Sequence, residues 1–120
     1  MKKIIFVFLL ASFVSCAGAT KSEKEKTAET GWSDDDTYTV SAEDATEQKA
    51  IEKAKYQILK DIVDVRVKNN SRYTDIIKIQ GEFEIPLKNG KVIQKIERPN
   101  GVKIFFQIRD NGLRQKFQRK

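Results

Sequence analysis

The stretch that decides the fold runs from Val92 to Ile108 and reads VIQKIERPNGVKIFFQI. β-Branched and aromatic residues fill both halves of it, as is typical of strands. Between the halves, Arg98-Pro99-Asn100-Gly101 has the composition of a turn, since proline suits position i+1 and glycine tolerates a left-handed conformation. The stretch therefore predicts an antiparallel hairpin, with Ile96 opposite Ile104.

A second turn signal lies just upstream, at Asn89-Gly90. This dipeptide favours a two-residue hairpin loop and would set Phe83 opposite Ile96. Both predicted hairpins point the same residues of the shared strand, Val92, Gln94 and Ile96, toward the core, and a slip of one residue would reverse that. Residues 74–87 are accordingly predicted to be one long strand, bent at Gly81.

The segment before this sheet predicts a short strand and then a helix. Thr37 to Ser41 is rich in strand-forming residues, and Ser41 and Asp44 have the spacing of a capping box. Apolar residues then recur with the 3.6-residue period of an amphipathic helix, at Ala54, Ile58, Ile62 and Val65. We therefore predict an α+β fold, one amphipathic helix packed on an antiparallel sheet of about four strands, in a single domain spanning residues 31–120.

The first residues read MKKIIFVFLLASFVSCAGAT and have the layout of a secretory signal peptide. Lys2 and Lys3 precede an apolar run over residues 4–14, and small residues follow it. The run is shorter than the roughly 17–25 residues of a membrane span. We expect residues 1–15 to be a signal peptide that directs export.

Two cleavage sites are possible. Phe13-Val14-Ser15-Cys16 resembles the lipobox of bacterial lipoproteins, and Cys16 is the single cysteine of the chain. The resemblance implies that diacylglycerol is joined to the Cys16 sulfur and that Cys16 becomes the mature N-terminus. Because Ala17 rather than aspartate follows, it also implies retention in the outer membrane. The alternative is cleavage after Ala19, at Ala17-Gly18-Ala19, which would release a soluble periplasmic or secreted protein.

Residues 17–30, AGATKSEKEKTAET, contain no large aliphatic or aromatic side chain. Such a segment buries too little apolar surface to offset its ordering entropy. We expect residues 16–30 to be a lipidated cysteine followed by a flexible tether that spans roughly 20 Å.

Composition argues against catalysis. The chain has no histidine, no cysteine besides Cys16 and no glycine-rich phosphate loop. Glu82 and Glu84 would share a strand face, but a solvated strand supplies no burial to raise a carboxyl pKa. We expect a non-catalytic protein, with no catalytic residues, cofactor or metal.

Two groups of residues are candidates for binding a partner. On the outward face of the predicted sheet, apolar residues gather at Pro86, Ile93 and Phe105. In the tail, basic residues could contact an anionic surface, although a solvated tail is the alternative reading: Arg114, Lys116, Arg119 and Lys120. Leu113 and Phe117 are spaced to dock on the core as a last helical turn.

The net charge is +6, and removing Lys2 and Lys3 with the leader lowers it to +4. For an exported protein, this excess favours lipid headgroups, lipopolysaccharide or an acidic protein surface over nucleic acid. The stacking aromatics of an RNA-binding sheet are also missing from the sequence.

The strand, the helix AEDATEQKAIEKAKYQILKDI and the later sheet resemble the N-terminal domain of the flagellar assembly protein T family and similar small outer-membrane lipoproteins. The resemblance rests on pattern and implies an envelope assembly or binding module that is held in the membrane by its lipid. It carries over no site residues.

Overall fold

The computed structural model describes residues 28–120. The leader, Cys16, the Ala17-Gly18-Ala19 site and most of the predicted tether lie outside the described residues.

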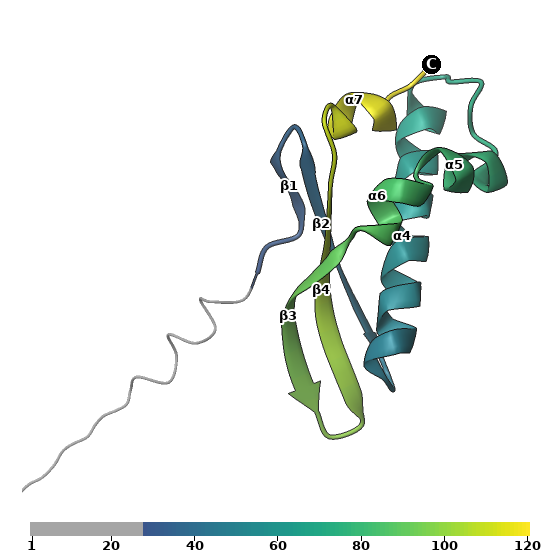
Figure 1. Cartoon of the computed structure of the whole chain (residues 1–120). Helices are drawn as coiled ribbons and strands as arrows, with labels where there is room; N and C mark the ends of the chain where they lie inside the picture. Colours follow the sequence, from purple (N-terminus) through teal and green to yellow (C-terminus); the bar gives the residue numbers. More distant parts are fainter. Residues whose placement is uncertain (1–27) are drawn as a thin grey trace, which may run out of the picture.

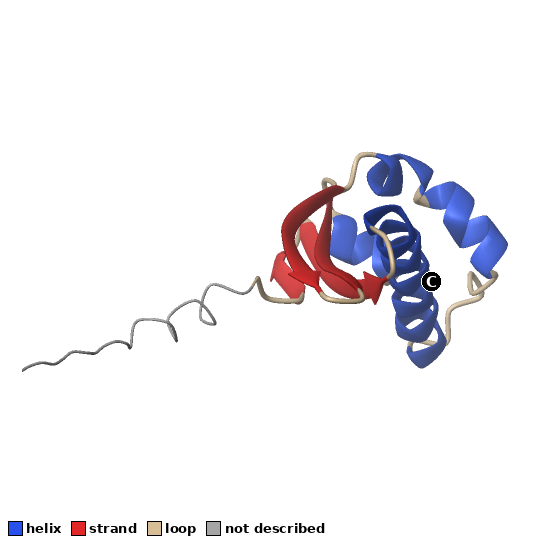
Figure 2. Cartoon of the chain, turned by 90° about the horizontal axis from the view of Figure 1, so that it is seen from below, coloured by secondary structure: helices blue, strands red, loops and turns tan. Residues whose placement is uncertain are grey.

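The described chain is an α+β fold, as predicted: a four-stranded antiparallel sheet of order β1-β2-β4-β3, with helices (Figure 1). One long helix lies along one face of this sheet, and shorter helices cluster near its C-terminal end (Figure 2). In chain order the elements are β1 (Gly31–Asp34), β2 (Thr37–Asp44), α4 (Glu47–Lys68), α5 (Ile76–Glu82), α6 (Glu84–Lys88), β3 (Lys91–Arg98), β4 (Gly101–Arg109) and α7 (Leu113–Phe117).

The amphipathic helix is α4, and Ala54, Ile58 and Ile62 of its predicted apolar stripe are buried. Val65 is only partly buried, and the next buried position of the helix is Arg66. The helix begins later than the predicted capping box, because β2 continues to Asp44, which pairs with Val102 of β4. The N-cap is Thr46, whose side-chain hydroxyl accepts a hydrogen bond from the backbone N–H of Lys49. After α4, Asn70 takes a left-handed conformation with φ 58°.

The predicted long strand over residues 74–87 is wrong, because this segment forms α5 and α6. Asp75 starts α5, and its carboxylate accepts a hydrogen bond from the backbone N–H of Ile77. The buried residues Ile79, Phe83 and Leu87 are four apart, so they follow a helical spacing that brings them onto the core. Their odd-numbered positions also fit the alternation of a strand, and local pattern alone did not separate the two.

Asn89-Gly90 is correspondingly not a hairpin loop, and it connects α6 to β3. Gly90 is needed for a different reason: a Cβ atom there would lie 2.3 Å from the ring of Phe106. The glycine thus permits the backbone to pass directly over a core aromatic side chain.

The hairpin of β3 and β4 forms, but its register differs by one residue from the prediction. Arg98 pairs with Gly101 and Lys95 with Ile104, around a loop of only Pro99 and Asn100. A bulge between Val92 and Gln94 shifts the pairing again, so Val92 pairs with Phe106. Of the three β3 residues predicted to point toward the core, Val92 packs against it, and Gln94 and Ile96 point to the opposite face.

The face of the sheet opposite α4 is partly covered by the curled strands and by the chain just before β1. The strands curl (Figure 2), and the backbone N–H of Ala28, just before β1, donates to the side chain of Gln94 on β3 at 2.6 Å. Phe105 lies on this face between Ser41 and Gln94 and is only 3% exposed.

The apolar contact surface predicted at Pro86, Ile93 and Phe105 is therefore wrong. Pro86 and Phe105 are buried, the first in α6 and the second under the curled sheet. Ile93 is 43% exposed at the bulge of β3. The three side chains do not form one exposed patch.

Candidate functional site: a basic end built on Arg66

The C-terminal part of α4, the loop over residues 69–75, α5 and α7 meet at one end of the domain (Figure 1). As the sequence predicts, Leu113 and Phe117 dock α7 on the core, and both side chains are fully buried. The ring of Phe117 packs against Trp32 at 4.7 Å and Phe83 at 5.7 Å between centroids. The C-terminal segment is thus held against both the sheet and the helices.

The centre of this end is Arg66, which is 1% exposed. Its Nε donates to the carbonyl of Phe117 at 3.2 Å, and its Nη2 donates to the carbonyl of Lys116 at 2.7 Å. Its Nη1 donates to the carbonyl of Tyr73 at 3.1 Å and to the carboxylate of Glu82 at 2.8 Å. A buried guanidinium requires this degree of pairing, because an unpaired buried charge is costly.

Glu82 joins Arg66 to the chain end, since its second carboxylate oxygen accepts a hydrogen bond from Arg119. The Arg119 guanidinium also lies over the ring of Tyr73, 4.0 Å from its centroid. Burial acts to raise the pKa of Glu82, but the hydrogen bonds and charges of Arg66 and Arg119 outweigh it and hold the pKa below the ordinary value of 4.5.

Two hollows adjoin at this ion pair, and Arg66, Glu82 and Arg119 line both of them. The larger has a volume of about 580 Å³ and the smaller about 370 Å³. Together they are lined by five cationic side chains and two carboxylates: Arg66, Arg72, Lys78, Lys116 and Arg119, with Asp75 and Glu82. Asn111 and Gln115 add amide groups to the larger hollow.

Not all of these charges are neutralised. The Lys116 ammonium binds the Asp110 carboxylate at 2.8 Å, and Glu82 serves Arg66 and Arg119. Arg72 and Lys78, by contrast, make no ion pair with any residue between 28 and 120. The arrangement can therefore receive an anionic group, and the donors for it are already in place.

The basic residues predicted from the tail divide into two sets. Lys116 and Arg119 line the hollows. Arg114 lies elsewhere on α7, where it pairs with Asp35 at 3.6 Å and stacks over Trp32. Lys120 is exposed and lines neither hollow.

The sequence reasoning missed Arg66, Arg72 and Lys78. A signal for Arg66 existed, because it continues the four-residue series of Ala54, Ile58 and Ile62 and therefore occupies a core position of α4. No comparable signal marks Arg72 and Lys78, which the loop and α5 bring into place.

A second surface feature is a groove of about 310 Å³ between α4 and α5. Tyr56, Leu59, Ile76 and Ile77 supply its apolar lining, and Ile77 is 71% exposed. Its charged residues, Glu52 and Lys55, are of opposite sign. This groove offers apolar contact without a charge preference.

Across residues 28–120, no helix combines the length and the apolar character that crossing a membrane would require. The same residues hold no group of three or more side chains suited to binding a metal ion.

Comparison with known proteins yields no family model, curated protein or solved structure that matches this chain.

Replacing Glu82 by glutamine tests the ion pair at the basic end. Because the pKa of Glu82 is depressed in the folded state, its stabilising effect is present above the unfolded value near 4.5 and is lost as the pH falls through the folded pKa. We expect Glu82→Gln to lower the free energy of unfolding by about 1–3 kcal/mol at pH 7. The difference in unfolding free energy between Glu82→Gln and the wild type should become smaller below about pH 4.5.

Urea denaturation at pH 7 and pH 3 measures both effects. Glu84→Gln is the matched control, because Glu84 is exposed and makes no ion pair within residues 28–120. If the difference in unfolding free energy between Glu82→Gln and the wild type stays constant with pH, Arg66 and Arg119 do not stabilise the wild-type Glu82 carboxylate.

Proposed function

We propose that this protein is a lipid-anchored, non-catalytic binding module of the bacterial envelope. Cys16 carries the lipid and holds the protein in the outer membrane, and the basic end of the folded domain binds an anionic partner. The observation that supports binding is the pair of adjoining hollows, lined by five cations and two carboxylates. The anchor rests on the lipobox-like sequence and on the position of the single cysteine.

The geometry favours binding because two of the cations, Lys116 and Arg119, are held before any partner arrives. Arg119 is fixed between Glu82 and the ring of Tyr73, and Lys116 belongs to a helix whose carbonyls are tied to Arg66. A donor that is already positioned loses less conformational entropy on binding. An anion that enters either hollow would meet Arg119 at the shared wall. In the smaller hollow it would also meet the two cations that make no ion pair within residues 28–120, Arg72 and Lys78.

The groove between α4 and α5 favours a second role, assembly with a protein partner. Ile77 and Tyr56 are among the most exposed large apolar side chains of the described residues. Clustered apolar surface of this kind is typical of protein contact sites. Both roles place the module at the membrane without any catalytic step.

The anchor is tested by Cys16→Ser, which keeps the apolar run and the Ala17-Gly18-Ala19 site. The wild type should incorporate labelled palmitate and enter the detergent phase of a cloud-point extraction, because each buried methylene contributes about 0.8 kcal/mol of membrane affinity. The variant should incorporate no label and remain as precursor or appear as a soluble form cut after Ala19. A wild type that is soluble, unlabelled and begins at Thr20 would contradict the anchor.

The anion site is tested by titrating the mature protein with inorganic phosphate while recording amide chemical shifts by NMR. At constant ionic strength, saturable shifts should appear in residues 72–78 and 111–119. Residues 46–53, at the opposite end of α4, should not respond. Lys78→Glu should weaken the response and Lys49→Glu should not, although both reverse one exposed lysine. Equal shifts with chloride, or shifts spread over the whole domain, would refute a localised site.

A further inference from the structure

We infer that the basic end is the surface by which the domain lies on an anionic phospholipid bilayer, with lipid phosphates in the two hollows beside Arg119. This inference rests on the proposed function and names the anionic partner of the same site. It makes the domain a second point of attachment to the membrane, in addition to the lipid on Cys16.

Exposed apolar side chains at this end of the domain favour a bilayer over an acidic protein. Val67, in the last turn of α4, is 56% exposed, and Tyr73 is 37% exposed next to Arg119. Tyrosine rings are enriched at membrane interfaces, where one end of the side chain meets lipid and the other meets water. An end that presents exposed apolar residues together with cations that make no ion pair within residues 28–120 matches the chemistry of a bilayer surface.

The cations also come from separate elements, which suits a surface of many headgroups. Arg72 belongs to the loop before α5, Lys78 to α5 itself, and Lys116 to α7. Each basic residue near an anionic membrane contributes about fivefold in affinity. A single peptide carboxylate would engage only a fraction of them.

The predicted tether permits this contact. Eleven residues lie between Cys16 and Ala28, so the twelve Cα-to-Cα steps of the extended chain reach at most about 40 Å. The 22 residues of α4 are about 33 Å long. An anchor at Cys16 therefore leaves the basic end free to reach the same bilayer.

A fluorescence measurement tests the inference, because Trp32 is the single tryptophan of the chain. Its ring lies against Phe117 of α7 and under the Arg114 guanidinium. Its fluorescence therefore reports the distance between the basic end and the bilayer surface. We would add the mature protein to vesicles containing a dansyl-labelled lipid and measure energy transfer from Trp32. One set of vesicles is phosphatidylcholine alone, and the other also contains phosphatidylglycerol.

Transfer should be more efficient with phosphatidylglycerol and should fall at high salt, because screening weakens attraction between exposed charges. In Arg72→Glu/Lys78→Glu, the ratio of docked to undocked domains should fall roughly 25-fold or more, from about fivefold for each lost cation. The matched control Lys49→Glu/Lys88→Glu reverses two exposed lysines away from the hollows and should behave as the wild type. Circular dichroism checks that both double variants fold. If Arg72→Glu/Lys78→Glu does not fold, Arg72→Gln/Lys78→Gln is used in its place.

Three results would overturn the inference. Equal transfer in both vesicle types would show that the end does not recognise anionic lipid, and would favour an acidic protein partner. Saturable amide shifts with inorganic phosphate, in a protein whose energy transfer is absent from both vesicle types, would show that the hollows take free phosphate and not lipid. Equal loss in both double variants would show attraction by net charge alone. The test does not depend on the anchor, because an unlipidated protein would still transfer energy if its basic end bound the vesicles.

Discussion

One buried guanidinium organises the end of the domain that carries the candidate site. Arg66 donates four hydrogen bonds to groups between 7 and 51 residues away, from Tyr73 to Phe117. An arginine can be buried only when such partners are present. The loop over residues 69–75, α5 and α7 must therefore all be in place before this part of α4 can pack. The aromatic group around Phe117 reinforces the same junction, with Trp32 and Tyr38 packing on it from the sheet side.

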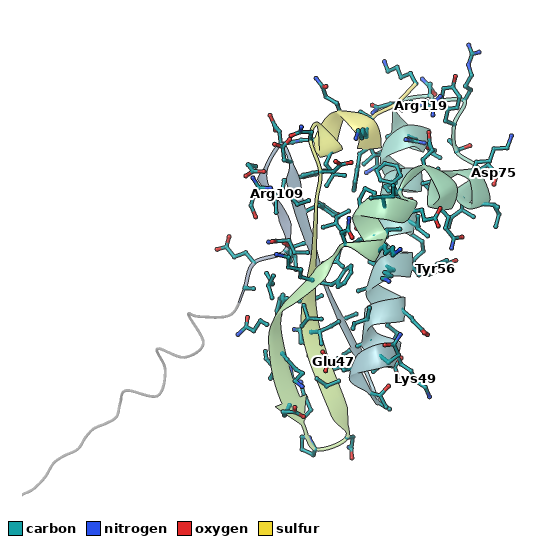
Figure 3. The ribbon with its side chains drawn as sticks, viewed as in Figure 1. Glu47, Lys49, Tyr56, Asp75, Arg109 and Arg119 are labelled. Atoms are coloured by element: carbon teal, nitrogen blue, oxygen red, sulfur yellow. The ribbon has the colours of Figure 1, made fainter. Side chains whose placement is uncertain are left out.

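This constraint determines the electrostatics of the surface. Glu82 is committed to Arg66 and Arg119, so it does not also neutralise Arg72 and Lys78 in the smaller hollow. The result is a positively charged end on a domain that otherwise mixes charges of both signs along α4. The opposite end is marked by Glu47 and Lys49 at the start of α4, far from Arg119 in Figure 3. Binding of an anion would thus be confined to the end that Arg66 builds.

The sequence predicts the fold where one periodicity is unambiguous. The buried stripe of α4, the turn at Pro99-Asn100 and the docking of Leu113 and Phe117 all follow from local spacing. It fails over residues 74–87, where Ile79, Phe83 and Leu87 fit a helix and a strand equally well, so tertiary packing decides. It also fails at the register of β3, because the turn contains two loop residues and shifts the pairing by one, and because a bulge at Ile93 shifts it again without a mark in composition. For the site, tail charge indicates Lys116 and Arg119, whereas Arg66 is hidden by the assumption that a helical arginine is solvated.

Native-state hydrogen exchange of Arg66→Met tests most directly whether Arg66 holds this end together. Methionine fills much of the space but removes the hydrogen bonds that Arg66 donates to Glu82 and to three carbonyls. We expect the amides of α5 and α7 to lose protection together, while those of the β2–β4 ladder keep theirs. Arg98→Met, which removes an exposed arginine paired with Glu43, should change neither region. Unchanged protection in α5 and α7, or an equal loss throughout the domain, would contradict the central role of Arg66.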